Sequence, residues 1–153
     1  MSLSDFSSSM YSFYDDAQNN GIIDFDVITS QNFESGKRNT LNMIAKWNSE
    51  TYGNKNTCSS GYKDIWGEIQ EQVNDGWFIP SKEEWTKFNK ATGIDLSYNS
   101  YIGKNLSDRY MSSSLNNSIS YYINENEDGM YSTNTQGHPT VDGSSYVRLA
   151  TTF

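Results

Sequence analysis

The side chains that could carry out catalysis are few and far apart in the sequence. His138, the only histidine, lies between Gly137 and Pro139 in a stretch typical of a turn, where a general base is difficult to orient. Cys58 is the only cysteine, so neither an internal disulfide nor a thiolate metal cluster can form within the chain. We therefore expect His138 to be a loop residue and Cys58 to be a spectator thiol.

Neighbouring acidic residues could supply the two carboxylates that a glycoside hydrolase uses. Three candidate pairs are Asp15 with Asp16, Glu68 with Glu71, and Glu83 with Glu84. Ser81 and Glu84 match a capping box, in which each side chain bonds a free amide at the start of a helix. Glu83 suits the same helix terminus, and Glu68 and Glu71 suit a solvated helix face. We predict that the chain has no catalytic residues and is not an enzyme.

One stretch matches the first half of a calcium loop. Asn124, Asn126 and Asp128 alternate as oxygen ligands. The twelfth loop position, however, is Thr135, where a bidentate glutamate is required. A β-hairpin turn at Asp128 and Gly129 explains the same residues. We favour the hairpin, keep calcium at Asn124, Asn126 and Asp128 as the weaker alternative, and expect no other cofactor.

The strip from Ser112 to Asp142 has the composition of a recognition surface. Tyrosine offers contact area at a small entropic cost, and small polar residues offer adaptable hydrogen bonds. If Tyr122 points outward, alternation along the strand turns Ile119, Tyr121 and Ile123 toward the core. Ordinary solvated strands and loops would also explain this composition. The candidate ligand-binding residues are Asn116, Asn117, Tyr122, Tyr131, Asn134 and His138.

Composition limits the partners and the compartment. The 153 residues carry a net charge of −8, so a phosphate backbone is an unsuitable partner and we expect no nucleic-acid binding. No apolar run is long enough to cross a membrane, and residues 1–6 do not resemble a signal peptide. The Ser-, Asn- and Tyr-rich composition favours a piece of a longer exported chain over a cytoplasmic protein. We therefore expect an extracellular or cell-surface location.

The secondary structure that must position these residues is expected to change from helices to strands along the chain. The spacing in residues 1–20 suggests an extension that forms a docked short helix, and residues 22–28 suggest a strand. Helices are expected near 37–48, 62–73 and 81–92, followed by short strands at 110–114, 119–123, 129–133 and 146–153. Helices followed by antiparallel strands indicate an α+β domain over residues 21–153, with large aromatic rings supplying much of its core.

Three motifs in this order resemble the C-type-lectin-like domains of bacterial surface proteins. They are Gly76–Trp85, Tyr110–Ser114 and Tyr146–Phe153, and the likeness covers residues 35–153. Similar segments occur in the formylglycine-generating enzymes and in the variable proteins of diversity-generating retroelements. The resemblance implies a C-type-lectin-like fold with about three helices followed by a small twisted antiparallel sheet. Met111 departs from the family pattern, which has tryptophan there, and a flexible thioether can fill that space.

The resemblance also limits the activity. The formylglycine-generating branch requires a cysteine pair near the C-terminal end, which a chain with Cys58 alone cannot provide. The calcium-binding triplets of sugar-binding C-type lectins are absent as well. We expect a non-catalytic ligand-recognition module of a bacterial surface, adhesin or phage-related protein that binds a glycan or a protein. The alternatives are a structural or assembly domain that contacts only subunits and, less favoured, an enzyme of the formylglycine-generating superfamily without its cysteine pair.

Overall fold

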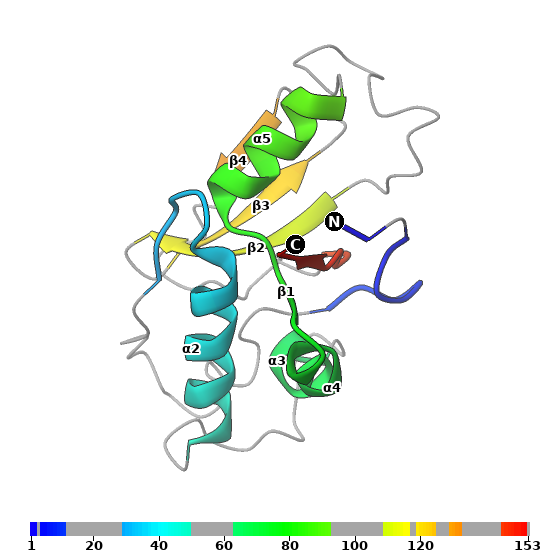
Figure 1. Ribbon diagram of the computed structural model, residues 1–153, viewed down its shortest axis with the longest axis vertical. Helices are drawn as coiled ribbons and strands as arrows, with labels where there is room; N and C mark the ends of the chain where they lie inside the picture. Colours follow the sequence, from blue (N-terminus) through cyan, green and yellow to red (C-terminus); the bar gives the residue numbers. More distant parts are fainter. Residues whose placement is uncertain are drawn as a thin grey trace.

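The computed structural model describes residues 1–2, 4–11, 29–49, 63–92, 109–116, 119–124, 129–132 and 145–152. These residues form a mixed arrangement of helices and small antiparallel sheets, which confirms the α+β class (Figure 1). The strand predicted at 22–28, the loop that contains Cys58 and the residue after the third predicted helix, Gly93, lie outside the described residues.

Helices form where the apolar spacing predicts them. The first is α2 (Gly36–Asn48) and the last is α5 (Lys82–Thr92). The helix expected near 62–73 is divided into α3 (Ile65–Glu68) and α4 (Gln70–Asn74). Ile69 lies between them, yet its amide still bonds the carbonyl of Ile65 at 3.2 Å and its carbonyl still accepts from Val73 at 2.9 Å. The stretch is therefore a locally distorted helix in which the hydrogen-bond pattern continues.

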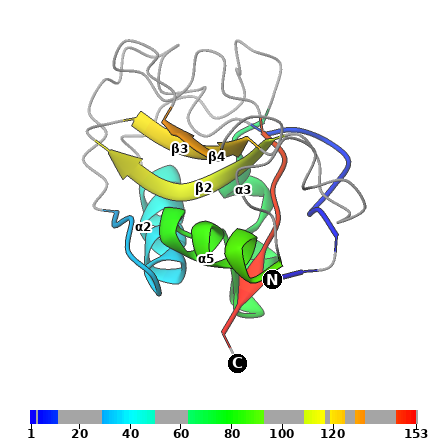
Figure 2. The same ribbon diagram turned by 90° about the horizontal axis from the view of Figure 1, so that it is seen from above.

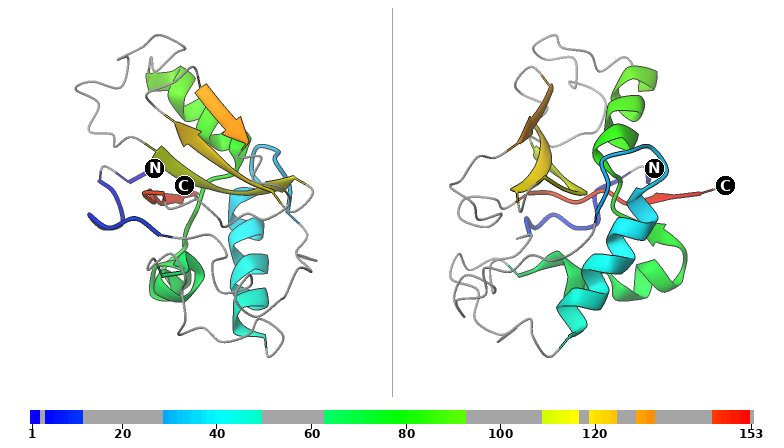
Figure 3. Two further views of the ribbon diagram at one scale, coloured as in Figure 1. Left: turned by 180° about the vertical axis from the view of Figure 1, so that it is seen from behind. Right: turned by 90° about the vertical axis from the view of Figure 1, so that its left-hand side faces the viewer.

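The larger of two antiparallel sheets follows three of the predicted strands, and of the strand expected at 146–153 only Ala150–Thr151 forms among the described residues. The larger sheet has the order β2 (Arg109–Asn116), β3 (Ile119–Asn124) and β4 (Gly129–Ser132), and Figure 3 shows its twist. The smaller sheet pairs β1 (Trp77–Phe78) with β5 (Ala150–Thr151). Helices α2 and α5 lie on the same side of the larger sheet (Figure 2). The sheet is thus supported by helices on that side.

A bulge interrupts β2. Met111 pairs with Tyr122 and Leu115 pairs with Ser120, so Ser112–Ser114 lie opposite a single residue of β3. All three serines are fully buried. An insertion of this kind bends the strand and redirects its polar groups. Here it brings the hydroxyl of Ser114 to the amide of Lys82, the first residue of α5.

Aromatic rings supply a large part of the core, as the composition predicts. The main cluster contains the fully buried Met43 and Trp66 with aliphatic residues around them. A second cluster consists of Trp85 and Tyr110, whose ring centroids are 5.1 Å apart. The indole nitrogen of Trp85 donates to the carbonyl of Met111 at 3.2 Å, so its polar edge is satisfied in the interior. These contacts join α5 to β2.

The short helix predicted within residues 1–20 is not present in residues 1–2 and 4–11. Those residues run antiparallel to residues 145–149, and Tyr11 and Ser145 form a β-bridge. Backbone pairing with a distant segment overrides the helical spacing of Phe6 and Met10, because it satisfies the same amides. Tyr11 belongs to the main core cluster, so this segment is part of the folded unit.

Among the helices that the structure describes, none combines the length and the apolar character needed to span a bilayer.

Candidate functional site

The structure places three of the six predicted ligand-binding residues on the larger sheet. Tyr122 and Tyr131 are directly opposite each other on β3 and β4, and Met111 pairs with Tyr122 from β2. One row of residues therefore crosses the sheet from Met111, which is buried in the main core cluster, through the two tyrosines. Asn116 pairs with Ile119 at the far end of β2, so it is not in that row. Asn117, Asn134 and His138 lie outside the described residues.

The two strands of the predicted hairpin, β3 and β4, pair antiparallel, while residues 125–128 between them lie outside the described residues. Asn124 pairs with Gly129 in the last register position before the connection. The remaining calcium candidates, Asn126 and Asp128, lie outside the described residues. Within the described part of the chain, no group of three or more His, Cys, Asp or Glu side chains is arranged to hold a metal ion.

The first residues of the predicted recognition strip are in the interior, which corrects that part of the prediction. Ser113 donates its amide to the carbonyl of Pro80 at 2.9 Å, and the hydroxyl of Ser114 accepts from the amide of Lys82 at 3.0 Å. The same hydroxyl donates to the carbonyl of Ser30 at 2.9 Å. Serine is usually exposed, but here the bulge brings Ser112–Ser114 to backbone groups that need partners. These serines therefore fasten β2 to α5.

Asn39 is the centre of a buried polar network that the sequence analysis missed. Its Oδ1 accepts from the amide of Ser30 at 2.9 Å, and its Nδ2 donates to the carbonyl of Ser30 at 2.6 Å. That carbonyl also accepts from the hydroxyl of Ser35 at 2.9 Å. Asn39 lies four residues before the buried Met43, so the apolar spacing of the helix places it on the core face. Its helical position was the signal that could have revealed it.

Thr40, the next residue of α2, joins the helix to Ile79, which directly follows β1, and the start of α2 requires a small residue. Its hydroxyl donates to the carbonyl of Gly36 at 2.8 Å and accepts from the amide of Ile79 at 3.0 Å. A Cβ atom at Gly36 would collide with the carboxylate of Glu84 and would lie 2.9 Å from the carbonyl oxygen of Ile79. Glycine is therefore needed where α2 begins, because backbone segments meet there at close range.

The predicted capping box is confirmed. Glu84 accepts the amide of Ser81 at 2.6 Å, and Ser81 accepts the amide of Glu84 at 3.3 Å. Glu83 accepts the amide of Phe33 at 3.1 Å. Glu84 therefore has the structural role that the motif predicts, and Glu83 bonds the backbone of a distant segment.

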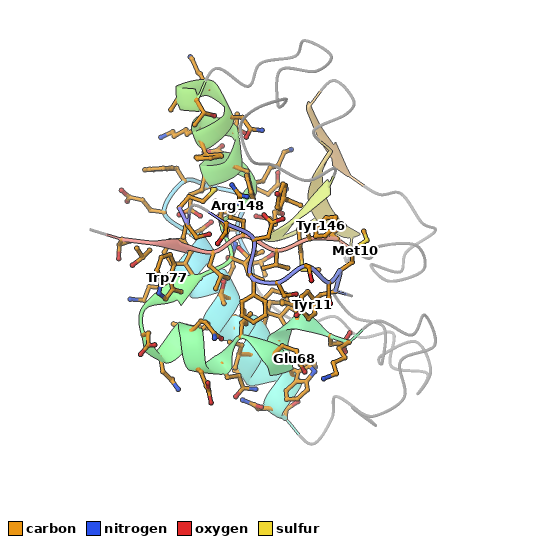
Figure 4. All side chains as sticks on the ribbon, turned by 90° about the vertical axis from the view of Figure 1, so that its right-hand side faces the viewer. Met10, Tyr11, Glu68, Trp77, Tyr146 and Arg148 are labelled. Carbon is orange, nitrogen blue, oxygen red and sulfur yellow. The ribbon has the colours of Figure 1, made fainter. Side chains whose placement is uncertain are left out.

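A second polar cluster joins the two ends of the described chain. Asp5 Oδ1 accepts from Nε and Nη2 of the buried Arg148, at 3.0 and 2.7 Å, and from the hydroxyl of Tyr110 at 2.7 Å. The guanidinium also lies 5.4 Å from the centre of the Tyr110 ring. A charged arginine is retained in the interior because a carboxylate and an aromatic face accompany it. Figure 4 shows Arg148 between the two terminal segments.

The described polar residues in both networks bond to the fold itself, so these contacts organise the scaffold. Among the predicted ligand-binding residues that the structure describes, Tyr122 and Tyr131 are the two that lie directly opposite each other. No significant match to this chain was found among protein-family models, curated proteins or solved structures.

Proposed function

We propose that this chain is a C-type-lectin-like domain that recognises a glycan or a protein ligand on its β2–β3–β4 sheet and does not catalyse a reaction. The observation that carries the proposal is the pairing of Tyr122 with Tyr131 on adjacent strands. Residues directly opposite each other in an antiparallel pair are close neighbours, and paired aromatic residues form effective contact surfaces.

Contacts among the three resembling motifs support the proposed fold family. Trp85, from the first motif, bonds the backbone of Met111 in the second. The amide of Met111 in turn donates to the carbonyl of Tyr146, in the third motif, at 3.0 Å. The amide of Ser113 bonds Pro80, and this contact joins the second motif to the first again. Motifs that are far apart in sequence thus share one core, as expected for scaffold motifs.

The bonds of three amide and acidic side chains support a binding role over catalysis. Asn39, Glu84 and Asp5 all bond backbone or side-chain donors of the fold. A catalytic group has to be positioned next to a substrate, and its surroundings commonly shift its pKa. An exported, cell-surface setting as part of a longer chain belongs to the same proposal, and calcium remains the weaker cofactor alternative.

Array binding tests the proposal. The purified chain is applied to a glycan array and a peptide array, next to the Tyr122→Ser/Tyr131→Ser double variant. Phe33→Ala is the matched control, because it removes an exposed aromatic ring outside the sheet. We expect the wild-type chain and the control to bind the same array members and the double variant to lose them. Equal binding by all three chains would exclude the tyrosine row as the site.

Light scattering separates recognition from subunit assembly. If the tyrosine row contacts only other subunits, the wild-type chain forms an oligomer that the double variant does not form, and neither chain binds the arrays. If it recognises a ligand, the two chains have the same mass in solution and differ in array binding.

A further inference from the structure

Segment 1–11, of which the structure describes all residues but 3, binds along a distant part of its own chain in the way that an extended peptide ligand would. It runs antiparallel to residues 145–149 (Figure 4). An extended segment that adds to an exposed backbone edge is a common mode of peptide recognition. Four backbone bonds join the two segments: Ser2 N to Leu149 O at 2.7 Å, Phe6 N to Val147 O at 2.7 Å, Tyr11 N to Ser145 O at 2.9 Å, and Ser145 N to Tyr11 O at 3.0 Å.

Asp5 gives this docking its chemical selectivity. Arg148 and Tyr110 direct three hydrogen-bond donors to one carboxylate oxygen. Arg148 is buried, so an occupant without a carboxylate would lose this ion pair and its two charge-assisted hydrogen bonds in the interior. The two residues therefore select an extended segment that carries an acidic side chain at this point.

Apolar residues on both sides of Asp5 complete the match. Phe6 packs against the main core cluster, and Tyr11 is buried in it. Met1 packs against the cluster of Trp85 and Tyr110. An occupant must therefore place apolar groups on either side of its carboxylate, as segment 1–11 does.

We propose that residues 145–149, together with Tyr110, form a docking edge for an extended acidic peptide, and that segment 1–11 of a second copy of this chain is the partner that fits it. Segment 1–11 occupies the edge in its own chain, and residues 12–28 connect it to the next described residue. An identical segment from a second copy would make every one of the same contacts, which is why exchange of terminal elements is a low-cost route to association. Partial opening of such peripheral segments requires less free energy than global unfolding.

A peptide with the sequence of residues 1–11 tests this exchange on the full-length chain. The peptide carries a fluorophore, and its fluorescence anisotropy is measured as increasing amounts of protein are added. The wild-type chain, the Asp5→Asn chain and the Asp75→Asn chain are compared. Asp75 is an exposed residue at the end of α4, so its substitution is the matched control. We expect the Asp5→Asn chain to bind the peptide at least about tenfold more tightly than the wild-type chain, because its own segment competes less for the edge. The control chain should behave as the wild type does.

The peptide itself supplies the second comparison. A peptide with the Asp5→Asn substitution should bind the Asp5→Asn chain at least about tenfold more weakly than the wild-type peptide, since charge-assisted bonds to arginine are lost. Circular dichroism confirms that each chain is folded. If Asp5→Asn does not fold, Phe6→Ala weakens the internal segment by another route and replaces it. Absence of saturable binding to a folded variant, or equal affinity of the two peptides, would overturn the proposal.

Discussion

Replacing Asn39 by alanine removes the side chain that fastens Ser30 to α2. Asn39 is fully buried, and it bonds both the amide and the carbonyl of Ser30, at 2.9 and 2.6 Å. In the variant, the carbonyl of Ser30 would still accept hydrogen bonds from the hydroxyl groups of Ser35 and Ser114, each at 2.9 Å. In the part of the chain that the structure describes, the Ser30 amide bonds no side chain other than Asn39, so the main loss falls on a backbone donor in a partly buried position.

The expected change follows from these bonds. A buried donor without a partner costs about 1–3 kcal/mol, and the lost carbonyl bond adds about 1 kcal/mol. Alanine favours the helix over asparagine by roughly 0.6 kcal/mol, which offsets part of this loss. We therefore expect Asn39→Ala to lower the free energy of unfolding by about 2–3 kcal/mol. Asn48→Ala is the matched control on the same helix, because Asn48 is exposed and its amide group bonds the side chain of the half-buried Gln70.

Urea denaturation followed by tryptophan fluorescence measures the difference. The slope of the free energy against urea should stay unchanged, since both variants expose the same surface on unfolding. The control should remain within about 0.5 kcal/mol of the wild type, as is usual for surface substitutions. If Asn39→Ala and Asn48→Ala have equal free energies of unfolding, the buried network does not contribute in the way that its geometry indicates.

Three further substitutions test local features of the scaffold. Gly67→Ala should lower the free energy of unfolding by about 1–3 kcal/mol, because the new Cβ would lie 2.6 Å from Cζ2 of Trp47. Helix propensity alone would raise the melting temperature, so a higher melting temperature would contradict this contact. Gly76→Ala should cost about 1–2 kcal/mol in urea denaturation, since its φ is +90° and nothing crowds the added atom; an unchanged midpoint would show that this backbone conformation relaxes. Ser81→Ala should cost about 1–2 kcal/mol through loss of the cap on Glu84, and Ser81→Thr should recover most of it; no recovery would argue against the cap.

Local signals in the sequence were sufficient to predict the helices and the capping box. The box depends on two residues three positions apart, and α2 depends on a repeat within a single segment. The division of the second helix at Ile69 follows from packing around it, so the apolar spacing carried no sign of it. The antiparallel strands were also predicted, because alternation and turn residues are local properties.

Features that depend on distant partners could not be predicted. The spacing of Phe6 and Met10 suggested a helix, but the backbone of this segment pairs with residues 145–149. Ser112–Ser114 looked like a solvated surface because the bulge and its partners, such as Pro80, are set by tertiary structure. In the candidate site, the sequence proposed Tyr122 and Tyr131 by residue type, and only the strand register brought them opposite each other.

The recognition proposal is tested most directly by mapping the bound ligand onto the backbone. The member that binds most strongly on the arrays is titrated into isotope-labelled chain, and the amide chemical shifts are followed by NMR. The account predicts that the largest shift changes occur in β3 and β4, around Tyr122 and Tyr131. Largest changes along α2, or around Ser30, would place the binding site elsewhere and contradict the proposed role of the sheet.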